Sequence, residues 1–193
     1  MKPVYRILLG FIFVIALFSC RTVPVQQIQI SRSLTGRAVL SEKQLITFFM
    51  MNNSLADRGQ VTRLARYYIS EAYDEGINSD VAFAQMCLET GFLRFGGLVT
   101  PEMHNYCGLG SIDTDHPGES FKTEQEGVRA HIQHLNAYGD TDSLVNPLVD
   151  KRAKWVTPRG KAPTVFELSG TWASDPAYGK KLDAILSKME SVR

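Results

Sequence analysis

The stretch VAFAQMCL, residues 81–88, decides the fold of this chain, because only one of its eight side chains, Gln85, is strongly polar. A helix that is apolar on every side is enclosed by other elements instead of lying at a surface. Asn78 or Ser79 is suited to cap the start of such a helix, so the sequence predicts a helix over about 80–90. We therefore expect a mainly α-helical domain assembled around one buried central helix.

Glu89 stands in the last turn of this predicted helix. A carboxylate is disfavoured there, because burial removes water from its charge and the helix C-terminus is itself negative. Both effects raise the pKa of the carboxyl group, which is what a general acid needs to keep its proton near neutral pH. The alternative is a structural glutamate that caps the helix end or forms a salt bridge, for example with Arg94, and the local pattern favours neither.

Helical periodicity recurs on both sides of this segment. Apolar residues at helical spacing predict four more helices. The first starts near residue 41, the second covers about 60–75, the third starts at Thr123, and the last follows Asp175, which is placed to cap it. Residues 92–121 are rich in glycine and turn-forming residues, and long ordered segments of this kind often carry function. No segment alternates clearly enough to predict a strand.

The N-terminus has a pattern that predicts export. Lys2 and Arg6 precede an apolar run over 7–18, which is shorter than the about 20 residues that cross a bilayer and is typical of a signal peptide. The run ends in LFSC, residues 17–20, which resembles a lipobox, so Cys20 is expected to receive lipid. The alternative is a plain signal peptide or membrane anchor with an incidental cysteine.

The chain is expected to have three parts. Residues 1–19 are the lipoprotein signal peptide, and residues 20–37, which mix Gln, Ser, Thr and Pro without a helical period, are a tether. Residues 38–193 are a single domain. This organisation predicts an exported protein that a lipid holds to a membrane of the cell envelope, on the periplasmic or outer-membrane side.

Composition excludes some classes of function. The net charge is +1 and no basic surface is indicated, so nucleic acid is not an expected partner. His131 and His134 lie one helical turn apart without an obvious third ligand, so neither a metal nor another cofactor is expected. Export would permit a disulfide between Cys87 and Cys107, but two small buried residues explain them as well. We expect a monomer.

Four motifs, in the same order along the chain, carry a family resemblance. They are AQMCLETGF at 84–92, NYCGLG at 105–110, GVRAHIQHL at 127–135 and WASDPAYG at 172–179. Together they resemble the glucosaminidase family of peptidoglycan hydrolases, a mannosyl-glycoprotein endo-beta-N-acetylglucosaminidase-like domain of glycoside hydrolase family 73 type. The resemblance spans about 41–189, which is nearly the whole predicted domain.

This resemblance implies a lysozyme-like α+β domain with a cleft and endo-β-N-acetylglucosaminidase activity. It assigns Glu89 as the acid and implies that Tyr178 reaches the cleft to support the substrate or the transition state. Asn105 and Tyr106 are expected to shape the floor of the cleft, and Asp175 to line it, although Asp175 also fits a helix cap.

Gln85 and Glu119 complete the expected site. Gln85 precedes Glu89 by four residues, so it is expected on the same helical face, beside the substrate. Many family members carry a second acid on a hairpin after the asparagine loop, but residues 110–123 show no convincing hairpin. Glu119 is the best remaining candidate, and the alternative is a single acid assisted by the acetamido group of the substrate.

Three functions remain open from the sequence. The leading one is hydrolysis of β-1,4 bonds in peptidoglycan glycan strands. A lytic transglycosylase would use the same glutamate but close the sugar on itself, which leaves an anhydro end. A lipoprotein that binds the cell wall without cutting it is the third, and the presence of Glu89 and Tyr178 speaks against it.

Overall fold

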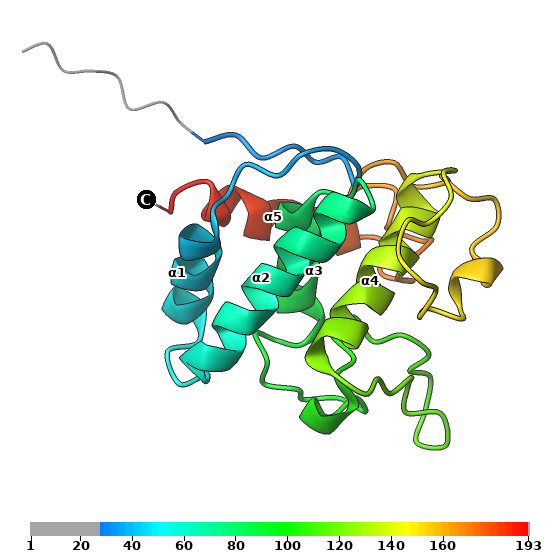
Figure 1. Ribbon diagram of the computed structural model, residues 1–193, viewed down its shortest axis with the longest axis horizontal. Coiled ribbons are helices and arrows are strands. Elements are labelled where there is room, and N and C mark those ends of the chain that lie inside the picture. Colours follow the sequence, from blue (N-terminus) through cyan, green and yellow to red (C-terminus); the bar gives the residue numbers. More distant parts are fainter. Residues whose placement is uncertain (1–27, 193) are drawn as a thin grey trace, which may run out of the picture.

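The computed structural model describes residues 28–192, which form a mainly helical domain (Figure 1). The elements are α1 Glu42–Asn52, α2 Arg58–Asp74, α3 Ser79–Glu89, the 3-10 helix η1 Pro101–Met103, α4 Glu124–Gly139, the 3-10 helix η2 Ala153–Trp155, and α5 Tyr178–Met189. Between residues 28 and 192 the β structure consists of isolated bridges. The expected mainly α class is thus confirmed, and it is consistent with a lysozyme-like domain.

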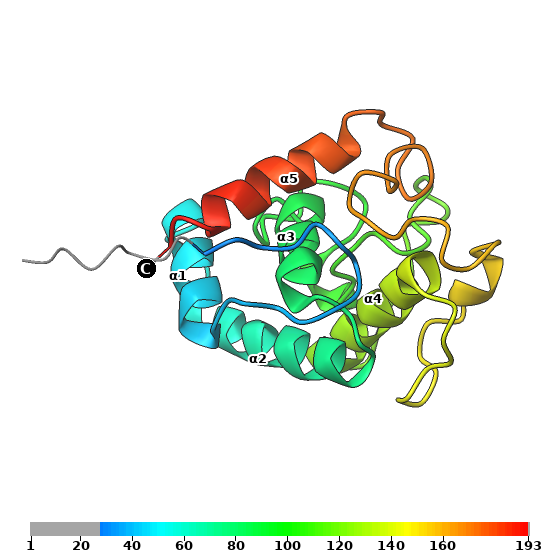
Figure 2. The ribbon, with the colours of Figure 1, turned by 90° about the horizontal axis from the view of Figure 1, so that it is seen from above.

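The helix α3 lies at the centre of the domain, and α1, α2, α4 and α5 surround it (Figure 2). Every residue from Ser79 to Cys87 is buried. Phe83 packs edge-on against Phe49 of α1 and Tyr68 of α2. Such burial of an aromatic ring contributes about 1.5–3 kcal/mol relative to an exposed one. The predicted buried central helix is therefore confirmed, and it ends at the surface with Glu89 as its last residue.

Local sequence explains where the surrounding helices begin. Ser41 forms a capping box with Gln44 at the start of α1, and Thr123 accepts a hydrogen bond from the backbone of Glu126 at the start of α4. Gly76 adopts a φ of 67° just beyond α2, where a side chain would be strained. The helices so delimited pack together, with α2 against both α4 and α3.

The segment before α1 differs from its prediction. Residues 28–37 were expected to be part of a tether, but Ile30 and Leu34 are buried in the core. Ser33 and Thr35 form bridges to distant segments, and Arg32 pairs with two acidic side chains of α5 and its C-terminal end. The tether prediction is wrong for these residues, because extended chain that packs through isolated bridges leaves no helical period in the sequence.

The predicted signal peptide and Cys20 lie outside the described residues. Within residues 28–192, no helix has both the length and the apolar character needed to cross a membrane. Cys87 and Cys107 are described, and both are free and buried, so the disulfide that export would permit does not form.

The last helix begins later than predicted. Asp175 was expected to cap it directly, but α5 begins at Tyr178 with Ala177 as the preceding cap residue. Asp175 instead accepts a hydrogen bond from the backbone N–H of Ala177 at 2.8 Å, which stabilises a separate turn before the helix. This turn directs Tyr178 toward the end of α3, where the two helices contact each other.

Candidate active site

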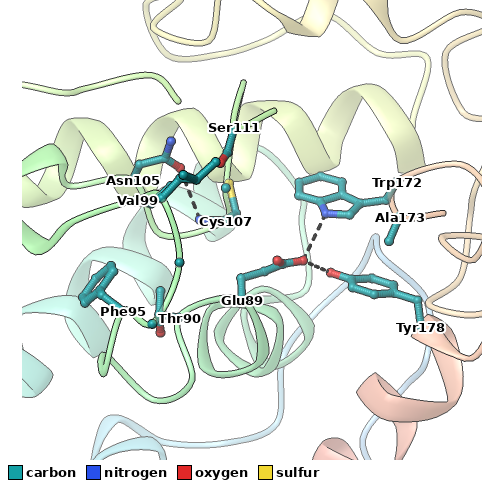
Figure 3. A pocket seen from close by; sticks show the side chains of 14 residues that line it. Glu89, Thr90, Phe95, Val99, Asn105, Cys107, Ser111, Trp172, Ala173 and Tyr178 are labelled. Carbon is teal, nitrogen blue, oxygen red and sulfur yellow. Dashed lines mark hydrogen bonds between the residues drawn. The ribbon is translucent and has the colours of Figure 1, made fainter. Parts of the chain in front are cut away.

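A cavity of about 330 Å³ opens at the C-terminal end of α3 (Figure 3). Its wall is formed by Glu89 and Thr90, by the loop over 95–99, by the segment over 105–111, and by residues 172–178. Three motifs that are far apart in the sequence therefore meet around one hollow. Of the described residues that line it, Glu89 is the only one with an acidic side chain.

The carboxyl group of Glu89 accepts hydrogen bonds from the described side chains on only one of its two oxygens. The Tyr178 hydroxyl and the Trp172 indole Nε1–H, the latter at 3.2 Å, both donate to Oε1 (Figure 3). The other oxygen, Oε2, lies on the side of Gly108, where an added Cβ would stand 4.0 Å from it. No described residue donates a hydrogen bond to Oε2, so this oxygen is free to act on a bound molecule.

Burial raises the pKa of Glu89 above its ordinary value, although the residue itself is open to the cleft. Protein atoms displace much of the water around the carboxyl group, which penalises the charged form. The hydrogen bonds from Tyr178 and Trp172 act in the opposite direction, because they stabilise the carboxylate and lower the pKa. The net effect is a pKa above the ordinary value of a glutamate.

Arg94 does not pair with Glu89, so the expected alternative of a salt bridge between these two residues is wrong. The Arg94 guanidinium donates to the backbone oxygens of Gly91 and Asn52, at 2.9 and 2.8 Å. It thereby ties the end of α3 to the end of α1 and leaves the carboxyl group of Glu89 to the cavity.

The chain makes a sharp turn directly after α3. The Thr90 hydroxyl donates to the backbone oxygen of Met86 and accepts from the backbone N–H of Leu93, at 2.7 and 2.9 Å. Phe92 and Leu93 both adopt positive φ, 58° and 59°, a conformation that is uncommon for residues with side chains. Backbone of this kind is often found at functional sites, and here it turns the chain back to form one wall of the cavity.

Asn105 holds the opposite wall. Its buried side-chain amide donates to the backbone oxygens of Leu109 and Glu119, at 2.9 and 3.0 Å, and its Oδ1 accepts from the N–H of Leu109 at 3.0 Å. Asn105 thus lines the cavity as expected and also fixes the loop that carries Gly108. Tyr106, which was expected beside it, is fully buried behind the loop and does not line the cavity.

Gln85 lies on the same face of α3 as Glu89, as predicted, because both side chains bond the Tyr178 hydroxyl, but its expected contact with the substrate is wrong. Its side chain is fully buried and does not line the cavity, so it does not lie beside the substrate. Its Nε2 donates to the Tyr178 hydroxyl at 2.8 Å, and Tyr178 in turn donates to Glu89. Gln85 is therefore linked to Glu89 through Tyr178.

The structure does not bring Asp175 or Glu119 into the cavity. The Asp175 carboxylate pairs with Lys181 at 2.6 Å and caps its own turn. The Glu119 carboxylate faces Arg152 at 3.5 Å. Arg152 lines a second hollow, which shares Trp172 and part of the asparagine loop with the first.

Trp172 has a role that the sequence reasoning missed. A tryptophan in a motif suggests either a sugar-stacking platform or a core residue, whereas here its indole N–H donates to the acid. His134 and Tyr138 of α4 pack against the ring, with centroids at 5.1 and 5.3 Å. The position of Trp172 at the start of the WASDPAYG motif, six residues before Tyr178, was the available signal.

The fold and the site together define a class of protein: a helical domain with a carboxyl group of raised pKa in a cleft, as glycoside hydrolases use to protonate a leaving sugar oxygen. Residues 65–191 match the family Glucosaminidase, described as mannosyl-glycoprotein endo-beta-N-acetylglucosaminidase, and the chain belongs to this family. Membership supports a peptidoglycan-hydrolysing glycosidase in general.

A relative occurs in Borreliella burgdorferi (strain ATCC 35210 / DSM 4680 / CIP 102532 / B31). It is 40% identical over 156 residues, which cover 81% of this chain and 76% of the relative. This relative is named "Uncharacterized protein", which assigns it no activity. No solved structure gives a significant match to the chain.

Proposed function

We propose that this protein is an endo-β-N-acetylglucosaminidase, which hydrolyses the β-1,4 bond on the reducing side of N-acetylglucosamine in peptidoglycan strands. The observation that carries the proposal is the environment of the Glu89 carboxyl group. Its pKa is raised by burial, its Oε1 is held by Tyr178 and Trp172, and its Oε2 is open to the cavity. These are the properties of a general acid.

The arrangement implies which oxygen carries the reactive proton. Because Tyr178 and Trp172 both donate to Oε1, the proton of the acid form of Glu89 belongs on Oε2, which faces the cavity. Transfer of this proton to the glycosidic oxygen leaves a carboxylate whose charge the two donors on Oε1 stabilise. General acid catalysis of this kind contributes about 10²–10⁴-fold to a rate.

The missing second carboxylate supports a mechanism assisted by the substrate. A retaining enzyme with two carboxyl groups places them about 5–5.5 Å apart, but the cavity has no acidic side chain besides Glu89 among the described residues. The acetamido oxygen of the substrate then attacks the anomeric carbon as the bond to the leaving oxygen breaks and Glu89 gives up its proton. In the second step water attacks the same carbon, Glu89 takes a proton from this water, and the bond between the carbon and the acetamido oxygen breaks, which restores the acetamido group.

Mass spectrometry of the fragments from digested peptidoglycan tests the proposal. Wild-type protein should release fragments with new reducing N-acetylglucosamine ends, and Glu89→Gln should not. Anhydro ends would instead identify a lytic transglycosylase. The absence of new ends with wild-type protein would leave a protein that binds the cell wall without cutting it.

We further propose that the protein is exported and anchored to the cell envelope by a lipid on Cys20. The basic head, the apolar run and the LFSC sequence support this. A fatty-acid probe should label the wild-type protein and not Cys20→Ala, and equal labelling of both would refute the anchor.

A further inference from the structure

A continuous line of buried hydrogen bonds leads through the protein to Glu89. The Tyr68 hydroxyl of α2 bonds His131 Nδ1 of α4 at 2.8 Å, and His131 Nε2 bonds Gln85 Oε1 of α3 at 3.1 Å. Gln85 Nε2 then donates to the Tyr178 hydroxyl of α5 at 2.8 Å, and Tyr178 donates to Glu89 Oε1. Four helices thus contribute one side chain each to a relay that ends on the acid.

Each tyrosine hydroxyl and the neutral imidazole carry a single donated proton, and the Gln85 amide donates only through its NH₂ group, so the relay has a direction. Burial lowers the pKa of His131 to about 3, so the ring is neutral and carries one N–H. The Tyr68 proton has no acceptor among the described residues except His131 Nδ1, which places the ring N–H on Nε2. His131 therefore donates to Gln85 Oε1, and the amide of Gln85 must present its NH₂ group to Tyr178.

The orientation of the Gln85 amide decides where the proton of Glu89 sits. While Gln85 donates to the Tyr178 oxygen, the single Tyr178 proton points to Glu89 Oε1, so the acid proton is confined to Oε2. If the amide turned over, Tyr178 would donate to Gln85 Oε1. The Tyr178 oxygen would then be free to accept the Glu89 proton from Oε1, on the side away from the cavity.

We propose that His131 is a positioning residue for the acid, because its Nε2–H fixes the Gln85 amide and so keeps the catalytic proton of Glu89 on the oxygen that faces the cleft. Tyr68 supports this role by selecting the tautomer of His131. The predicted effect of His131 on catalysis rests on the proposed function. The predicted effect of His131 on the pKa of Glu89 does not depend on that function.

The test compares two replacements of His131 that differ in hydrogen bonding. His131→Gln retains one donor and one acceptor, whereas His131→Met fills a similar volume and offers Gln85 only a weak acceptor. We expect His131→Met to lower kcat by roughly two- to tenfold, the change in population that one ordinary hydrogen bond produces, with KM unchanged. His131→Gln should retain the kcat of the wild type.

A second measurement needs no activity: NMR titration of the Glu89 carboxyl carbon in isotope-labelled protein. The pKa of Glu89 should rise in His131→Met, because the carboxylate loses the Tyr178 donor, and should stay near the wild-type value in His131→Gln. The other ionisable groups that face Glu89 are Tyr178 and Cys107, and burial raises the pKa of both, so neither titrates near neutral pH. His134 lies on α4 one turn after His131, and none of the variants replaces it.

Asn136→Met is the matched control. Asn136 is a buried polar residue of the same helix that bonds Glu75 and Arg159, away from the relay. The Asn136→Met variant should have a lower thermal midpoint than the wild type, with kcat and the pKa of Glu89 unchanged. Equal effects of Met and Gln at position 131, or no effect of either on the Glu89 pKa, would overturn the proposal. A wild-type protein that cuts no peptidoglycan would refute the proposed function and leave the titration to decide on the relay.

Discussion

Replacement of Glu89 by glutamine removes the transferable proton and leaves the shape of the side chain intact. In Glu89→Gln the amide oxygen can take the place of Oε1 and accept from Tyr178 and Trp172. The NH₂ group then occupies the place of Oε2, which faces the open side of the cavity near Gly108. The substitution therefore introduces no clash and breaks neither hydrogen bond.

The expected loss of activity is large. Removal of a general acid lowers turnover by about 10²–10⁴-fold. At a factor of ten for each 1.36 kcal/mol, this raises the barrier by about 3–5 kcal/mol. Release of soluble fragments from purified peptidoglycan, measured over time at several substrate concentrations, gives kcat and KM for both proteins. The loss should appear in kcat.

The thermal stability of Glu89→Gln should not fall with its activity and should equal or exceed that of the wild type. Because burial raises the pKa of Glu89 in the folded state, ionisation costs more in the folded than in the unfolded protein. The cost is absent below the ordinary pKa of a glutamate and is fully present above the raised pKa. The thermal midpoint of Glu89→Gln should therefore equal or exceed that of the wild type at neutral pH, and the difference should shrink in acid. A well-folded variant with near-normal turnover would refute the role of Glu89.

Three further outcomes are expected. Glu119→Gln should retain most activity, because that carboxylate lies outside the cavity, and a loss as large as that of Glu89→Gln in the same fragment-release assay would restore a second catalytic carboxylate. Tyr178→Phe should lower kcat by roughly tenfold or more, as expected for a lost hydrogen bond to a charged group. Because that bond lowers the pKa of Glu89, its loss should also move the basic limb of the pH–rate profile to higher pH. Leu34→Ala should destabilise the fold by about 2–5 kcal/mol in a denaturant titration, because the side chain is fully buried, whereas no loss would indicate a tether.

Local sequence was sufficient for the helical framework and for the position of Glu89 at the end of the buried helix. The apolar stretch before Glu89 could only be an enclosed helix, and the end of that helix could only hold the glutamate at the edge of the core. Capping residues such as Ser41 and Thr123 located helix starts for the same reason, because a cap acts on backbone groups within a few residues. Two expectations of this kind were wrong in detail, the start of α5 and the tether over 28–37.

Only the tertiary structure decided which side chains act on the acid. Gln85 and Tyr178 are 93 residues apart in the sequence, and Tyr68 and His131 are 63 apart, yet each pair shares a hydrogen bond. Helical periodicity indicates that such a residue faces inward, but it does not indicate which inward-facing group it meets. That choice depends on how four helices pack around α3, since a hydrogen bond requires its two atoms to approach within about 3 Å. The sequence by itself determined the buried helix and its terminal glutamate, and the packing determined which oxygen of that glutamate faces the cleft.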